Sequence, residues 1–209
     1  MTRSFVRAAL AATAVALAIA GCASMSKPEV GHDAVVAALK SSFVAKRQAG
    51  LDRLEQDETQ RVCSDYFGKP VPPDVASRLE KSNLAGVKWP ADGRYVGDWK
   101  KGEKVAQSGQ GMQYSDDPRN PSGGNCYACH QLTKSEISFG TIGPSLYQFG
   151  KLRGYTDEMR KYAYGKVSHA QASAACSNMP RFGAHGILTE QQIKDVVALL
   201  MDPKSPVNQ

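Results

Sequence analysis

Cys126-Tyr127-Ala128-Cys129-His130 is the stretch that decides the fold of this 209-residue chain. Two thiols separated by two residues and followed at once by a histidine form a haem-attachment motif, in which the thiols bond the porphyrin and His130 supplies the proximal iron ligand. A bare C-x-x-C also occurs in zinc sites and redox dithiols. No second pair follows to complete a zinc site, so a redox dithiol is the alternative. The motif predicts one covalently bound haem c held by Cys126, Cys129 and His130.

The opposite face of the iron needs a second axial ligand, and Met179 is the favoured residue. It lies in the stretch 178–183 (NMPRFG), where proline and glycine predict a fixed loop downstream of the attachment motif. Met159 and Met201 fall within predicted helices, where a role in the core is the default for methionine. A His130/Met179 pair is expected to raise the reduction potential.

The remaining histidines are weaker candidates for the iron. His185 is the alternative to Met179. His32 and His169 are expected at the protein surface.

A proline follows the motif at a useful spacing. A proximal histidine normally donates its second ring proton to a fixed acceptor, which determines its tautomer and basicity. The carbonyl of Pro144, in the stretch 143–146 (GPSL), suits that role because proline stiffens the loop. A plain turn is the alternative interpretation.

The N-terminus has the layout of an export signal over residues 1–21. Arg3 and Arg7 form a basic region, and 8–20 is an apolar run that is too short to span a bilayer permanently. The signal predicts an extracytoplasmic protein, and the periplasm is the expected compartment.

The way in which the signal is cut remains open. Ile19-Ala20-Gly21-Cys22 matches the box that lipoprotein processing reads, which would make Cys22 the lipid-bearing first residue. Ordinary cleavage after Ala20 would instead leave an exposed thiol in an oxidising space. We favour lipidation of Cys22, because it leaves no such exposed thiol. Acyl chains would then hold the protein at a membrane surface, at about 0.8 kcal/mol per buried methylene.

Cys63 and Cys176 remain after the lipid and haem cysteines are assigned. In an exported protein a disulfide between them is the simplest expectation. Closing so long a loop would stabilise the fold by roughly 4–5 kcal/mol on the chain-entropy model. A free functional thiol at Cys176, near the iron, is the alternative.

The amount and distribution of charge argue against a nucleic-acid partner. Loss of 1–21 removes two of 26 basic side chains and no acid, so 24 basic against 20 acidic side chains leave a net charge of +4. The basic residues are spread along the chain, without the clustering of a nucleic-acid binder. A mild positive charge suits an acidic partner or simply solubility.

The hydrophobic periodicity predicts an all-α protein without strands. An interior glycine, Gly102, indicates close approach of another backbone, and Gly50 is expected to divide the first helical stretch. The expected helices cover 33–66, 74–84, 100–112, 156–169 and a last helix between Thr189 and Pro203.

The last helix has the clearest signals. Thr189 and Gln192 form a capping box, and Leu188 with Ile193 is placed as a hydrophobic staple. Its expected buried stripe is Ile193, Val196, Val197 and Leu200. We divide the chain into a signal (1–21), a tether and helical extension (22–97) and a haem domain (98–209).

Several stretches of the haem domain follow known cytochromes in order. Residues 102–106 (GEKVA), the C-x-x-C-H motif, Gly143-Pro144-Ser145-Leu146 and Met179-Pro180 resemble class I c-type cytochromes. Residues 124–130, 140–146 and 178–183 are more specifically similar to SoxX, the small cytochrome subunit of the SoxAX complex of sulfur-oxidising bacteria. The tail, with 188–193 and 203–207, is similar to that family too.

The resemblance implies a class I fold and a place in thiosulfate oxidation. SoxAX joins thiosulfate oxidatively to a cysteine of the SoxYZ carrier, and the substrate-handling cysteine belongs to the SoxA-type partner. The SoxX haem, at Cys126, Cys129, His130 and Met179 in this sequence, would relay electrons to an acceptor cytochrome c. The isolated chain would then not be catalytic.

Two other functions remain open. One is a free electron-shuttle cytochrome. The long N-terminal extension argues against this function, because a shuttle gains nothing from the extra residues unless they bind a partner. The other is a haem sensor or ligand-binding lipoprotein, which would need an open position on the iron.

Overall fold

The structure is a computed structural model that describes residues 30–209. The predicted signal over residues 1–21 and Cys22 lie outside the described residues. The described chain divides into two compact units, residues 30–43 and residues 44–209. The first carries helix α2 (His32–Ser42), and the second carries all the predicted haem-binding residues.

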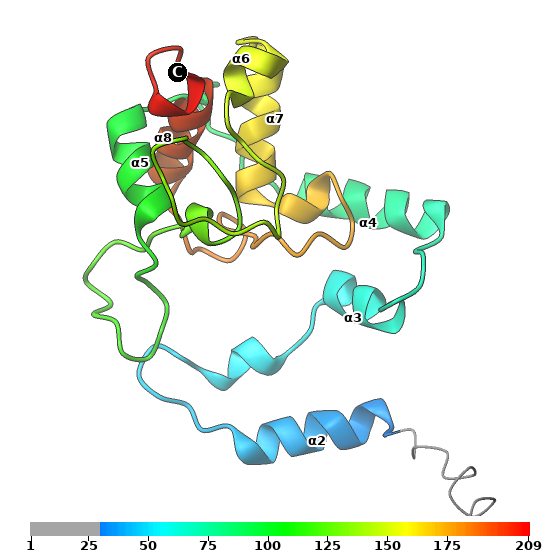
Figure 1. Cartoon of the computed structure of the whole chain (residues 1–209). Coiled ribbons are helices and arrows are strands. Elements are labelled where there is room, and N and C mark those ends of the chain that lie inside the picture. The colour runs from blue at the N-terminus through cyan, green and yellow to red at the C-terminus, as the bar shows by residue number, and fades with distance from the viewer. Residues whose placement is uncertain (1–29) are drawn as a thin grey trace, which may run out of the picture. The chain divides into compact units, whose positions relative to one another are not determined.

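The described chain is all-helical, as expected (Figure 1). Within residues 30–209 no helix is long and apolar enough to cross a membrane. The α-helices of the second unit are α3 (Glu58–Asp65), α4 (Pro73–Ala85), α5 (Trp99–Gln107), α6 (Phe149–Arg153), α7 (Asp157–Ser168) and α8 (Glu190–Met201). Its 3-10 helices are η1 (Leu51–Leu54), η2 (Cys126–Ala128), η3 (Ala170–Ala172) and η4 (Pro206–Asn208).

Helix α8 is the centre of the core. The predicted capping box is present, because Thr189 accepts from the Gln192 backbone while the Gln192 side chain accepts from Thr189 N–H. Every residue from Ile193 to Met201 is buried, including the predicted stripe. Burial of these apolar side chains stabilises the unit by about 25 cal/mol per Å² of apolar surface removed from water.

Helix α5 crosses α8 at very short range, as Gly102 predicted. A Cβ atom added at Gly102 would lie 2.0 Å from the carbonyl oxygen of Asp195, so only glycine fits there. Asp195 is itself buried and accepts a hydrogen bond from the Asp98 N–H at 2.9 Å, at the start of α5. The Lys194 side chain is also nearly buried and pairs with Asp92 (3.1 Å) and Glu190 (2.7 Å).

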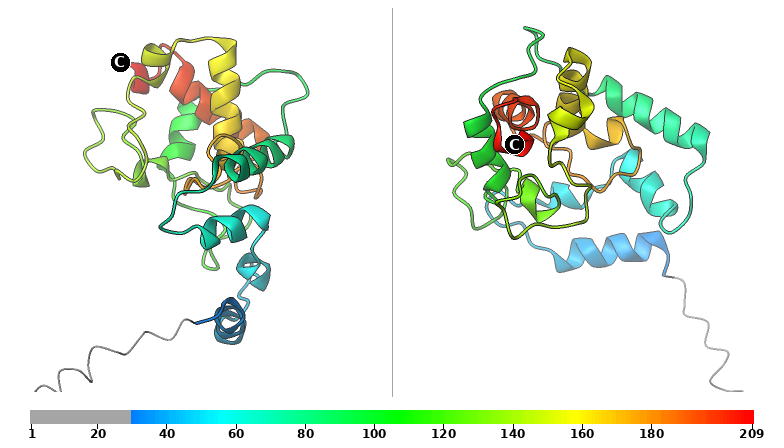
Figure 2. Two further views of the ribbon diagram at one scale, coloured as in Figure 1. Left: turned by 90° about the vertical axis from the view of Figure 1, so that its right-hand side faces the viewer. Right: turned by 45° about the horizontal axis from the view of Figure 1, so that its top comes forward.

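Helix α7 packs beside α8 (Figure 2) and contributes Tyr164 to the core. Tyr164 is 1% exposed, and its hydroxyl donates to the Lys88 carbonyl at 3.1 Å. Its ring lies 5.9 Å from that of Trp89 and 5.6 Å from that of Tyr95. These contacts attach the loop before α5 to the core, since aromatic pairs at such distances add to the free energy of burial.

Two expected helices are shorter than predicted. The stretch 33–66 is not continuously helical, because the backbone is extended at Phe43 and turns at Arg47 with a φ of 52°. The helix expected at 100–112 ends at Gln107, and the chain then passes through Gly111 and Met112 at positive φ. Helices α4, α7 and α8 lie within a residue or so of the expected bounds.

The segment 44–97 belongs to the same compact unit as the predicted haem domain. Leu79 of α4 is fully buried, and α4 packs against η3. The boundary that we placed at residue 97 stays a prediction, but the segment before it is tightly packed against the rest of the unit.

Candidate functional site

The C-x-x-C-H motif folds as one tight turn. Asn125 adopts the left-handed conformation, with φ 45° and ψ 43°, which asparagine tolerates better than most residues. The 3-10 helix η2 begins directly after it, and the His130 N–H donates to the Cys126 carbonyl at 2.9 Å. The turn therefore places Cys126, Cys129 and His130 next to one another.

The motif is attached to the end of α5. The Gly124 N–H donates to the Val105 carbonyl at 2.8 Å, and the Asn125 N–H donates to the Ser108 carbonyl at 2.9 Å. A Cβ atom on Gly123 would lie 2.0 Å from the Ser108 carbonyl oxygen, so the two segments can approach only through glycine. The motif thus has a fixed position relative to the core.

His130 has the partner that the sequence predicted. Its Nδ1 lies 2.7 Å from the carbonyl oxygen of Pro144. With Nδ1 protonated, that atom donates to Pro144, and Nε2 is left as the nitrogen that could bind iron. A Cβ atom on Gly143 would lie 2.2 Å from His130 Cε1, so the ring packs flat against a residue that has no side chain.

The loop that carries Pro144 is held beside the motif by its backbone. The Gly140 N–H donates to the Tyr127 carbonyl, and the Gly143 N–H to the Cys129 carbonyl, each at 2.8 Å. The acceptor for the histidine is therefore fixed by hydrogen bonds to the same turn that carries the histidine.

Cys126 and Cys129 are the two cysteines outside a disulfide in residues 30–209. Burial raises the pKa of the Cys126 thiol to about 12, so it is protonated at neutral pH. A redox dithiol works with a lowered thiol pKa, so this environment favours the haem interpretation over the dithiol. The paired thiols and the oriented imidazole form a donor set that fits haem c.

Met179 lies on a separate segment, between η3 and α8. It is half-buried against the core, and its N–H donates to the Ser177 hydroxyl at 3.2 Å. The Gly183 N–H, further along this loop, donates to the Ser168 carbonyl at 3.0 Å at the end of α7. The structure therefore fixes the loop that the sequence predicted, while ligation by Met179 remains a prediction.

The other histidines differ from expectation in one case. His169 is 6% exposed, so its expected surface position was wrong, and its Nδ1 has no hydrogen-bond partner within residues 30–209. Burial, followed by the positive charge of Arg181, lowers the pKa of His169. His32 and His185 are exposed. His185 lines a cleft of about 560 Å³.

A disulfide joins Cys63 of α3 to Cys176, with the two Cα atoms 5.5 Å apart. The sequence did not indicate a second link to the same loop, an ion pair between Arg181 and Asp57. The Arg181 side chain is 7% exposed, and no pattern of residue types marks an arginine for burial.

Two comparisons with known proteins agree with this arrangement. The sequence profile of the cytochrome c family matches residues 122–203, which include the motif, Pro144 and Met179. The chain is also 40% identical over 155 residues to an uncharacterized lipoprotein of Aquifex aeolicus (strain VF5), and the alignment covers 73% of each protein. Members of the matched family bind haem c covalently, which is what the free thiols beside His130 are suited to do. On this evidence the chain belongs to the cytochrome c family.

Proposed function

We propose that this chain is the electron-transfer haem subunit of a SoxAX-type complex, which couples thiosulfate to a cysteine of a SoxYZ-type carrier. The cytochrome c domain supports electron transfer through haem. The finer assignment is supported by the stretches 124–130, 140–146 and 178–183, whose residues resemble SoxX.

The residues proposed to hold the haem are Cys126 and Cys129 through thioether bonds, and His130 and Met179 on the iron. The observation that carries this proposal is the contact of His130 Nδ1 with the Pro144 carbonyl at 2.7 Å. It presents Nε2 in one orientation and makes the imidazole a stronger donor. The haem supplies a one-electron redox centre, and a second protein ligand keeps small molecules off the iron.

The overall reaction defines what the chain must do. Joining thiosulfate to a cysteine thiol forms one sulfur–sulfur bond, releases the thiol proton and removes two electrons. We place that bond formation on the SoxA-type partner, because the cysteines of residues 30–209 are either in a disulfide or suited to haem attachment. This chain would take the electrons one at a time and pass them to an acceptor cytochrome c.

Anchoring at a membrane surface fits this role. The Aquifex aeolicus relative is named a lipoprotein, which supports lipidation of Cys22 after removal of residues 1–21. We propose that the mature protein lies in the periplasm, attached by acyl chains. Mass spectrometry of the mature N-terminus tests the lipid.

The iron ligands are tested by the absorption spectrum of the oxidised holoprotein. We expect the weak red charge-transfer band of a methionine–ferric iron bond, and its loss in Met179→Leu. His185→Gln tests the alternative ligand and should retain the band, because His185 is exposed and we assign the iron to Met179. A band that survives in Met179→Leu would exclude Met179 as the ligand.

The assignment to a thiosulfate-oxidising complex is tested by reconstitution. Thiosulfate, the carrier and the partner subunit should reduce this chain, whereas thiosulfate alone should not. Pull-down from thiosulfate-grown cells should recover a second cytochrome. Equal rates of acceptor reduction with this chain omitted would exclude the proposed role.

A free electron-shuttle cytochrome is the second candidate, and one observation favours it. Residues 44–97 pack within the same compact unit as the haem-binding residues, so this part of the extension already has a role in its own chain. It therefore no longer argues for a partner. Recovery of the chain alone in the pull-down, with normal spectra, would support the shuttle.

A further inference from the structure

We propose that helix α3 positions Met179, by holding the segment 176–181 at both of its ends. The inference rests on the proposed ligation by Met179 and concerns how firmly that ligand is held. Helix α3 comes from the extension that precedes the matched cytochrome region.

The two attachments flank the methionine. On the N-terminal side, Cys176 is bonded to Cys63 within α3. On the C-terminal side, the Arg181 guanidinium donates to the carboxylate of Asp57, the N-cap residue of the same helix. The segment that carries Met179 is therefore fixed to one rigid helix at two points.

Asp57 has two functions at this end of α3. One carboxylate oxygen caps the helix by accepting from the Gln60 N–H at 2.9 Å, and the other accepts from Arg181. Burial raises the pKa of Asp57, but the hydrogen bonds from Gln60 and Arg181 outweigh it and leave the pKa below its ordinary value. The carboxylate is therefore charged at neutral pH and paired with a nearly buried arginine.

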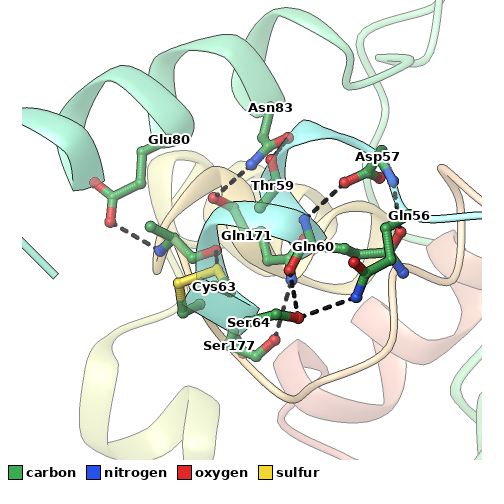
Figure 3. The surroundings of a disulfide bond; sticks show 12 residues. Gln56, Asp57, Thr59, Gln60, Cys63, Ser64, Glu80, Asn83, Gln171 and Ser177 are labelled. Atoms are coloured by element: carbon green, nitrogen blue, oxygen red, sulfur yellow. Dashed lines mark hydrogen bonds between the residues drawn. A yellow bond between two sulfur atoms is a disulfide. The ribbon is translucent and has the colours of Figure 1, made fainter. Parts of the chain in front are cut away.

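Helix α3 is in turn fixed to α4 (Figure 3). The Thr59 hydroxyl donates to the Asn83 side chain at 3.2 Å, and both residues are buried. The Asn83 amide donates to the Gln171 carbonyl at 3.4 Å, and the Glu80 carboxylate accepts from the Ala175 N–H at 3.1 Å. Helix α4 thus supports both α3 and the chain that leads into the Met179 loop.

This arrangement bears on how often the methionine leaves the iron. An external ligand can bind only when Met179 has moved away, so its apparent affinity is the intrinsic affinity multiplied by the population of the displaced state. A segment tied at both ends has fewer displaced conformations than one tied at a single end. Releasing either end should therefore increase apparent binding of a competing ligand.

The test is a titration of the oxidised full-length holoprotein with imidazole. Asp57→Asn removes the charge on one side of the ion pair but retains a good N-cap residue, so α3 should remain formed. We expect apparent imidazole affinity to rise about tenfold, equivalent to about 1.4 kcal/mol. Cys63→Ser with Cys176→Ser should raise it between about 10- and 100-fold, since the other end of the segment is released from a long loop.

Asp92→Asn is the matched control, because it breaks the ion pair with Lys194 on α8 and leaves the Met179 segment unchanged. It should change imidazole affinity by less than about twofold, even if loss of this partly buried ion pair lowers the free energy of unfolding. Unchanged affinity in both the Asp57 and the cysteine variants would overturn the inference, as would an equal increase in Asp92→Asn. If the wild type lacks the methionine–iron band, the proposed ligation itself is wrong, which is a separate outcome.

Discussion

The two sides of the candidate haem site are built in different ways. On the His130 side, the histidine and its acceptor Pro144 are 14 residues apart, and backbone hydrogen bonds join their loop to the motif. On the Met179 side, the links to α3 join residues 113 and 124 positions apart. The first side is a local structure, whereas the second depends on a distant segment of the chain.

This difference implies different sensitivities. The His130 side depends on close backbone approach, so it should respond most to an added side-chain atom. The Met179 side depends on long-range links, so it should respond most to their removal. Three changes test the comparison, described from the largest expected effect to the smallest.

Removal of the Cys63–Cys176 disulfide should have the largest effect on stability. We expect the double serine variant to lose roughly 4–5 kcal/mol of unfolding free energy, because the closed loop is long. Denaturant unfolding of the holoprotein, followed by circular dichroism, measures the loss. An unchanged midpoint would show that the long-range link contributes little and would weaken the comparison.

Gly143→Ala should have an intermediate effect on the His130 side. The new methyl group would lie 2.2 Å from His130 Cε1, and such overpacking costs roughly 1–3 kcal/mol. Gly86→Ala is the matched control, because its Cβ would lie 3.4 Å from the nearest atom, the Asn83 carbonyl oxygen, at a negative φ. Comparable losses in the two variants, measured by denaturant unfolding, would show that the ring contact is unimportant.

The smallest expected effect is the contribution of His169 to the pH dependence of the free energy of unfolding. Burial and then Arg181 lower its pKa below the ordinary 6.5, His185 acts in the same direction and Asp57 opposes them. As the pH falls below 6.5, His169 binds a proton more readily in the unfolded chain than in the folded chain. The stability that the neutral, buried His169 allows is therefore fully present above pH 6.5 and is lost as the pH falls.

His169→Asn should therefore show a shallower loss of unfolding free energy between about pH 7 and 5 than the wild type. Burial and then Arg181 lower the pKa of His185 as well, so His185→Asn should alter the slope in the same direction. Identical slopes in wild type and His169→Asn would contradict a neutral buried histidine.

The sequence predicted best where the signal is local. The capping box of Thr189 and Gln192, the buried stripe of α8 and the contact of His130 with Pro144 all depend on residues close together in the chain. The shortened helix α5 was missed, and the break predicted at Gly50 already begins at Phe43, because tertiary contacts and positive φ values at Arg47 and Met112 override helical patterning there.

By itself, the sequence determined the all-α class, the haem-attachment motif and the family. The reason is that haem attachment and helical periodicity each depend on residues that are close together in the chain. Only the tertiary structure decided that His169 lies inside and that Arg181 is buried against Asp57, which adds a second attachment of α3 to the one that the predicted Cys63–Cys176 disulfide makes. The physical reason is that burial and ion pairing depend on which distant segments meet. Contacts between distant segments depend on how the whole chain packs, so they cannot be read from any single stretch of residues.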